Sequence, residues 1–94
     1  MQDDEFEWDD VKAAINERDH HVTFEMARAA FRDLLAISRV DRGHPDPEER
    51  YAWLGMVDSR LLFVSYTLRD ERIRIISARK AEPHERRRYH NENR

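Results

Sequence analysis

The chain has 94 residues, of which 39% are hydrophobic and 39% are charged, and it contains no cysteine. This length predicts a single domain over residues 1–94 with a modest core. The lack of cysteine excludes disulfides and thiol chemistry. No apolar run approaches the roughly 20 residues of a membrane span, and the acidic start is unlike a signal peptide, so we expect a cytoplasmic protein.

The net charge of −3 conceals an uneven distribution of charged side chains. Residues 1–59 carry 7 basic and 15 acidic side chains, whereas residues 60–94 carry 10 basic and 5 acidic ones. The distribution of charge is a better guide to nucleic-acid binding than the total. The basic half therefore allows two interpretations, a surface that binds polyanions and a solvated surface that forms ion pairs with the acidic half.

The chain opens with a short apolar segment, residues 6–8, that suits a small edge strand. Asp9 is a suitable N-cap and predicts a helix over residues 10–19. The residues expected to share one face of this helix are Val11, Ala14 and Ile15.

A second helix is predicted over residues 24–34, with Thr23 as its N-cap. Its apolar residues recur at helical spacing, which indicates a core face. They are Phe24, Ala27, Ala30, Phe31 and Leu34. Only residues 20–22 separate the two helices, which favours an αα-hairpin.

The second half of the chain predicts strands and a final helix. The expected strands cover residues 35–41, 49–57, 60–69 and 72–78. Residues 43–47 form a loop between the first two strands, and residues 58–59 and 70–71 are short enough for hairpin turns. Residues 83–93 suit a helix. The predicted fold class is α+β, with two N-terminal helices, a four-stranded antiparallel sheet and a C-terminal helix.

The strand over residues 72–80 combines β-branched apolar residues with cations. Because strand side chains alternate between faces, Ile73 and Ile75 can point into a core while Arg72 and Arg74 point the other way. Cations that share one sheet face repel each other, and an anionic ligand such as nucleic-acid phosphate is one reason to keep them.

Most other kinds of site are poorly supported. The pairs His20-His21 and His84…His90 lack metal-ligand spacing on a helix, and the chain has no glycine-rich phosphate loop and no serine elbow motif. What remains is a group of arginines near strand ends: Arg50, Arg69, Arg74 and Arg79. Aromatic residues that suit either base stacking or the core accompany them: Tyr51, Trp53, Tyr66 and Tyr89.

The chain resembles the BrnT family of toxins over residues 6–89. The stretches that carry the resemblance are Phe6-Glu7-Trp8-Asp9 with Lys12 and Asn16; His20, Val22, Phe24, Glu25 and Ala27; Glu49-Arg50-Tyr51 with Leu54-Gly55; Leu62-Phe63-Val64 with Tyr66-Thr67 and Arg69; and Arg74 to Ala81 with Glu85 and Tyr89. The opening and closing stretches are the most specific.

This resemblance implies a RelE-like fold and a ribonuclease toxin of a type II toxin–antitoxin system, which cleaves RNA and inhibits translation. It implies neutralisation by a BrnA-like antitoxin, which binds DNA through a ribbon-helix-helix dimer and joins the toxin in a heterotetramer. No cofactor and no metal are implied. One departure concerns the turn between the helices, where His21 replaces the family's glycine and Asp19 replaces its lysine. His21 must then meet a left-handed position, or the helix ends differently.

The needs of RNA cleavage suggest roles for the residues within this resemblance. Arginine binds phosphate in a bidentate way and stays charged, so Arg69 and Arg79 are expected to stabilise the transition state. Supporting and RNA-binding cations are Arg50, Arg74, Lys80 and Lys12. Candidates for proton transfer are His20, Glu25 and Tyr89.

Other interpretations of these residues remain open. The arginines would also suit ion pairs with helix acids such as Glu25 or Asp33. An inactive protein-binding or nucleic-acid-binding module is the alternative function, and a metal hydrolase is a weaker one. The candidates for an apolar groove beside the basic site, which would equally suit the core, are Trp53, Leu54 and Met56.

Overall fold

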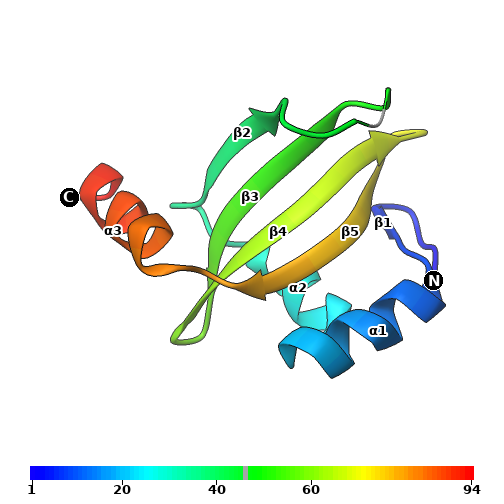
Figure 1. Ribbon diagram of the computed structural model, residues 1–94, viewed down its shortest axis with the longest axis horizontal. Helices are drawn as coiled ribbons and strands as arrows, with labels where there is room; N and C mark the ends of the chain where they lie inside the picture. Colours follow the sequence, from blue (N-terminus) through cyan, green and yellow to red (C-terminus); the bar gives the residue numbers. More distant parts are fainter. Residues whose placement is uncertain (46) are drawn as a thin grey trace.

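The computed structural model describes residues 1–45 and 47–94 (Figure 1). In chain order its elements are β1 (Phe6–Glu7), α1 (Asp10–His20), α2 (Phe24–Ala30), β2 (Ile37–Asp41), β3 (Arg50–Val57), β4 (Arg60–Arg69), β5 (Arg72–Lys80) and α3 (Pro83–Glu92). The predicted α+β class is confirmed. The predicted loop over residues 43–47 includes residue 46, which lies outside the described residues.

The strands form one sheet in the order β1-β5-β4-β3-β2. β2 to β5 make the predicted antiparallel meander, but β1 pairs in parallel with β5 through Phe6 and Ile73. The prediction of a four-stranded antiparallel sheet is therefore corrected to a five-stranded mixed one. The cause is a long-range pairing, since the Ile73 N–H also donates to the Glu5 carbonyl at 2.8 Å.

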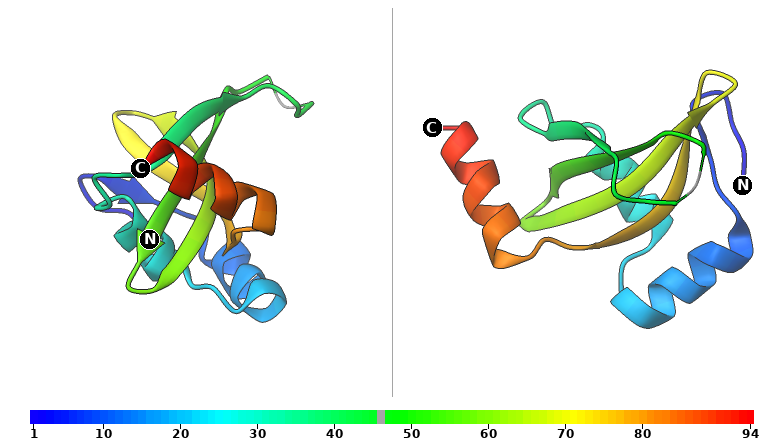
Figure 2. Two further views of the ribbon diagram at one scale, coloured as in Figure 1. Left: turned by 90° about the vertical axis from the view of Figure 1, so that its left-hand side faces the viewer. Right: turned by 45° about the horizontal axis from the view of Figure 1, so that its top comes forward.

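The main core lies between α1, α2 and one face of the sheet (Figures 1 and 2). Its buried members are Phe6, Trp8, Val22, Phe24, Ala27, Ala30, Leu62, Val64, Ile75 and Ala78. Ile75 therefore points into the core, as the alternation of β5 predicts.

The contact between α1 and the sheet depends on a buried asparagine. The Asn16 side chain donates to the carbonyls of Val22 (3.0 Å) and Ala78 (2.8 Å) and accepts from the Ala78 N–H (3.1 Å). The predicted apolar face is wrong, because Val11 is 69% and Ile15 43% exposed and Ala14 is also exposed. The hydrogen bonds between the Asn16 side chain and β5 direct the Asn16 side of α1 toward the sheet. The predicted apolar side of the helix therefore faces solvent.

The second helix ends at Ala30, four residues earlier than predicted, and Leu34 is 98% exposed instead of buried. Two tertiary hydrogen bonds accompany this early end. Trp53 Nε1 donates to the Ala30 carbonyl (2.9 Å), and the Met56 N–H donates to Asp33 Oδ2 (2.8 Å). A Cβ at Gly55 would lie 2.6 Å from the Ala30 oxygen, so only glycine permits this close approach.

Within residues 1–45 and 47–94, four non-glycine residues adopt left-handed backbone conformations. They are His21 (φ 57°), Asp58 (φ 55°), Asp70 (φ 52°) and Glu71 (φ 66°). His21 is the C-cap of α1, and its N–H donates to the Glu17 carbonyl, so of the two expected alternatives the left-handed position is the one found. The other three lie in the turns over residues 58–59 and 70–71, which are the predicted hairpin turns.

The last helix, α3, packs on the opposite face at one end of the sheet, apart from α1 and α2 (Figure 2). Tyr89 is its buried anchor and lies in a second cluster with Leu54 and Leu61. Met56 also packs there, whereas Trp53 stacks on Phe31 of the other face. The three candidates for an apolar groove thus belong to two separate parts of the core.

None of the helices that the structure describes is long and apolar enough to cross a membrane.

Candidate nucleic-acid interface

The sheet face that α1 and α2 leave uncovered is rich in arginine. Cross-strand partners share a face, so the pairs Arg39–Ala52, Arg69–Arg72 and Thr67–Arg74 assign several cations to it. We call it the arginine face; its cations are Arg39, Arg50, Arg69, Arg72, Arg74 and Arg79. Arg69 and Arg72 stand directly opposite each other, an arrangement that costs stability unless anions offset it.

A β-bulge places two of the predicted residues on the same face of the sheet. Arg74 and Arg79 are five positions apart, so strict alternation would place them on opposite faces. The β4–β5 register shifts between Ser65 and Tyr66, which leaves Ile76 without a partner. Arg74 pairs with Thr67 and Arg79 with Phe63, four residues apart on β4. The extra residue therefore returns both guanidinium groups to the arginine face.

Carboxylates hold three of these arginines in place. Arg69 Nη2 lies 3.0 Å from Glu48 Oε1, and this hydrogen bond raises the pKa of the Arg69 guanidinium. Arg74 Nη1 donates to Oε2 of Glu7, a residue of β1, at 2.7 Å. Arg79 forms an ion pair with Glu85. The arginines thus form ion pairs, but their partners are neither Glu25 nor Asp33.

Arg79, near the end of β5, lies between an aromatic ring and a carboxylate. Its guanidinium carbon lies 4.3 Å from the centre of the Phe63 ring. Nη1 and Nη2 donate to the two carboxylate oxygens of Glu85 at 2.8 and 3.0 Å, which raises the pKa of Arg79. Burial raises the pKa of Glu85, but the hydrogen bonds from Arg79 and the Glu82 N–H outweigh it, so the net shift is downward.

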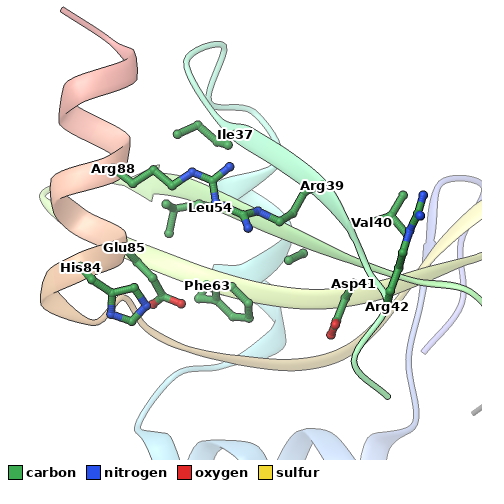
Figure 3. Close-up of a pocket in the computed structure, with 11 residues that line it drawn as sticks. Ile37, Arg39, Val40, Asp41, Arg42, Leu54, Phe63, His84, Glu85 and Arg88 are labelled. Carbon is green, nitrogen blue, oxygen red and sulfur yellow. The ribbon is translucent and has the colours of Figure 1, made fainter. Parts of the chain in front are cut away.

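A groove of about 440 Å³ lies between α3 and strands β2 to β4 (Figure 3). We call it the α3 groove; the side chains that define it are Arg39, Leu54, Phe63, His84, Glu85 and Arg88. Phe63 and Glu85 also hold Arg79, so the groove continues into the arginine face.

The predicted proton-transfer residues do not gather on the arginine face. His20 and Lys12 line a small hollow beside Ile76 and Ser77 at the edge of β5. Glu25 is exposed in the first turn of α2. Lys80 is exposed at the end of β5, and Arg50 begins β3 opposite Asp41.

Tyr89 is only 5% exposed, and its hydroxyl donates to Asp33 Oδ2 at 2.6 Å. Burial and this hydrogen bond raise the pKa of Tyr89 to about 12. The proton of this hydroxyl is therefore tied to Asp33 beneath α3.

The sequence analysis missed three residues of the α3 groove: Arg39, His84 and Arg88. For Arg39, the alternation of side chains along β2 was the available signal, since it places Arg39 on the same face as Ile37 and Asp41. His84 and Arg88 are four residues apart and so share a helix face. In the part of the chain that the structure describes, no group of three or more His, Asp or Glu side chains is arranged to hold a metal ion.

The fold and this surface define a small α+β protein with one sheet face rich in arginine. Residues 8–85 match the family described as the ribonuclease toxin BrnT of type II toxin–antitoxin systems. The chain therefore belongs to the BrnT family of ribonuclease toxins. Among curated proteins, none matches the chain.

Proposed function

We propose that this protein is a metal-independent endoribonuclease that cleaves RNA on the arginine face and thereby inhibits translation in the cytoplasm. The observation that carries the proposal is that Arg69, Arg74 and Arg79 share the sheet face that α1 and α2 leave uncovered, the last two because of the bulge at Ile76. Their positive charges match a phosphodiester chain. Membership in a family of ribonuclease toxins supports the same activity.

Cleavage without a metal requires activation of the 2′-hydroxyl, stabilisation of a dianionic phosphorane and protonation of the 5′-oxygen. We assign the second task to Arg79. The strand register places Arg69 six residues along β4 from the partner of Arg79, roughly 20 Å away, so Arg69 is assigned with Arg50 and Arg74 to neighbouring phosphates of the RNA. Glu85 occupies two donors of Arg79 but leaves others of its five N–H groups for a phosphate oxygen. Glu85 is a positioning residue in this scheme, since it fixes the guanidinium over Phe63.

Proton transfer is assigned to His84. Its imidazole lines the α3 groove, and its Nδ1 lies 3.8 Å from Glu82 Oε2, while Glu82 Oε1 lies 3.7 Å from Arg79 Nη1. Histidine can accept and return a proton near neutral pH. His20 and Glu25 are weaker candidates because they lie away from His84 and Arg79. In this proposal the hydroxyl of Tyr89 stabilises α3 and transfers no proton.

The partner proposed for the toxin is an antitoxin encoded with it. Type II systems pair a toxin with a protein antitoxin, and the family assignment supports such a partner. We further propose that the antitoxin is BrnA-like, that its ribbon-helix-helix dimer binds DNA, and that it forms a heterotetramer with this RelE-like toxin. Size-exclusion chromatography with light scattering on the co-expressed pair would measure the stoichiometry.

The proposal is tested by induced expression of the wild type beside Arg79→Ala, with growth and RNA 5′ ends followed together. We expect growth arrest and new 5′-hydroxyl ends with the wild type only. A folded Arg79→Ala variant that cleaves RNA as fast as the wild type would remove Arg79 from the site. Soluble wild type that yields no new ends would instead indicate a non-catalytic binding module.

Comparing the cleavage rates of His84→Gln and His20→Gln tests which histidine transfers the proton. We expect a loss of cleavage of about 100-fold or more for His84→Gln, the typical contribution of a general acid or base. A loss confined to His20→Gln would place the chemistry at the edge of β5 instead.

A further inference from the structure

We propose that the α3 groove is a nucleotide subsite, in which Arg39 and Arg88 bind the phosphate next to the cleaved one. This inference rests on the proposed function, since it specifies where the RNA continues beyond Arg79. The ligand class is a single-stranded RNA segment.

Two cations from distant parts of the chain meet at this groove. Arg39 comes from β2 and Arg88 from α3, and Figure 3 shows their side chains pointing toward one another above Leu54. Two guanidinium groups in such a position repel each other unless an anion lies between them. Their convergence therefore indicates an anion site.

Neither arginine is neutralised strongly by the protein. Arg39 pairs with Ala52 through the backbone ladder, but within residues 1–45 and 47–94 its side chain forms no hydrogen bond or ion pair. Arg88 Nε donates to Glu92 Oε2 at 3.2 Å, but this is an exposed pair one helical turn apart, which is a weak type of interaction. Both guanidinium groups therefore have N–H donors available for bidentate contact with phosphate oxygens.

The acids in the groove do not cancel its positive charge. Glu85 binds Arg79 through both carboxylate oxygens. Asp41 accepts from the Gly43 N–H at 3.0 Å and keeps its negative charge, but three lining arginines outnumber it: Arg39, Arg42 and Arg88.

The size and floor of the groove suit a nucleotide. Its volume of about 440 Å³ lies within the range of small-ligand pockets. Its floor is formed by apolar side chains, Ala52, Leu54 and Phe63, which suit the flat face of a base. A phosphate at the rim and a base on the floor use both features.

The groove also lies beside the proposed cleavage centre. Phe63 lines the groove and carries the Arg79 guanidinium 4.3 Å from its ring centre, and Glu85 joins the groove to Arg79 at 2.8 Å. A nucleotide in the groove would thus be adjacent to the phosphate held by Arg79.

The test measures binding apart from cleavage. The probe is a fluorescein-labelled RNA of about 12 nucleotides and mixed sequence, with a 2′-O-methyl group at every position so that it cannot be cleaved. Fluorescence anisotropy gives its Kd for the wild type, Arg39→Ala, Arg88→Ala and the control Arg18→Ala, an arginine on α1 with a side chain 72% exposed. Cleavage of unmodified RNA is followed in parallel.

We expect each groove variant to raise Kd about tenfold, since loss of one charged hydrogen-bonded contact has that size. The slope of log affinity against log salt should fall by about 0.7 for each lost phosphate contact. In cleavage, the fall in kcat/KM should come mainly from KM. Arg18→Ala should match the wild type, and Arg39→Lys should recover only part of the affinity because lysine lacks the fork.

The outcomes separate this inference from the proposed function. Wild type that binds the probe but cleaves nothing, with groove variants still weakened, would support the subsite and refute the ribonuclease. Wild type that cleaves RNA, with groove variants that bind the probe like Arg18→Ala, would overturn the subsite alone. Unchanged RNA affinity with weaker capture of the co-expressed antitoxin would likewise overturn it and assign the groove to the protein partner.

Discussion

Replacing Tyr89 with phenylalanine tests the attachment of α3, which forms one wall of the groove. The ring is 5% exposed and stays in place in the variant, so only the hydroxyl and its 2.6 Å hydrogen bond to Asp33 are lost. A hydrogen bond to a charged group is worth about 1.5–3 kcal/mol. Asp33 keeps the N–H donors of Leu35 (2.9 Å) and Met56 (2.8 Å), so it is not left unpaired.

We therefore expect Tyr89→Phe to lower the free energy of unfolding by about 2 kcal/mol and Tm by about 10 °C. Urea unfolding followed by circular dichroism measures the change. The matched control is Tyr51→Phe, which also removes a hydroxyl bonded to a carboxylate, at 3.1 Å to Glu49, but at the surface. This control should change the free energy by less than about 0.5 kcal/mol.

A double-mutant cycle with Asp33→Asn assigns the loss to the pair. The coupling free energy between the Tyr89 and Asp33 changes should be about 1–2 kcal/mol. Equal losses for Tyr89→Phe and Tyr51→Phe, or a coupling near zero, would refute the conclusion that this buried bond holds α3 to the body of the protein.

Three further predictions concern stability. His21→Gly should raise the free energy of unfolding by about 1 kcal/mol in urea titrations, because glycine removes the cost of a side chain at φ 57°; a His21→Ala variant should not gain. Gly55→Ala should lower it by about 1–3 kcal/mol, since the new Cβ would lie 2.6 Å from the Ala30 oxygen, and unchanged stability would argue against that close approach. The third concerns pH. The lowered pKa of Glu85 means that its contribution is present above its unfolded pKa of about 4.3 and is lost as pH falls through the folded pKa. Glu85→Gln should therefore flatten the loss of stability measured below about pH 4.3, and an unaltered pH profile would contradict the shift.

Much of this protein follows from local sequence patterns. Alternation along residues 72–75 placed the isoleucines in the core and the arginines on the other face, because side-chain direction in a strand depends only on neighbouring positions. The left-handed conformation at His21 was one of two alternatives that followed from the resemblance, in which glycine occupies this position. The fold class and the family assignment rest on such ordered local motifs.

Only the tertiary structure decided which functional groups lie together. The bulge at Ile76, which brings Arg74 and Arg79 onto one face, depends on register with β4. The early end of α2 and the parallel pairing of β1 likewise depend on hydrogen bonds to distant strands. The α3 groove joins Arg39 to Arg88 across the fold. Periodicity reports the faces of one element, whereas packing between elements sets which faces meet, and the candidate site is formed where they meet.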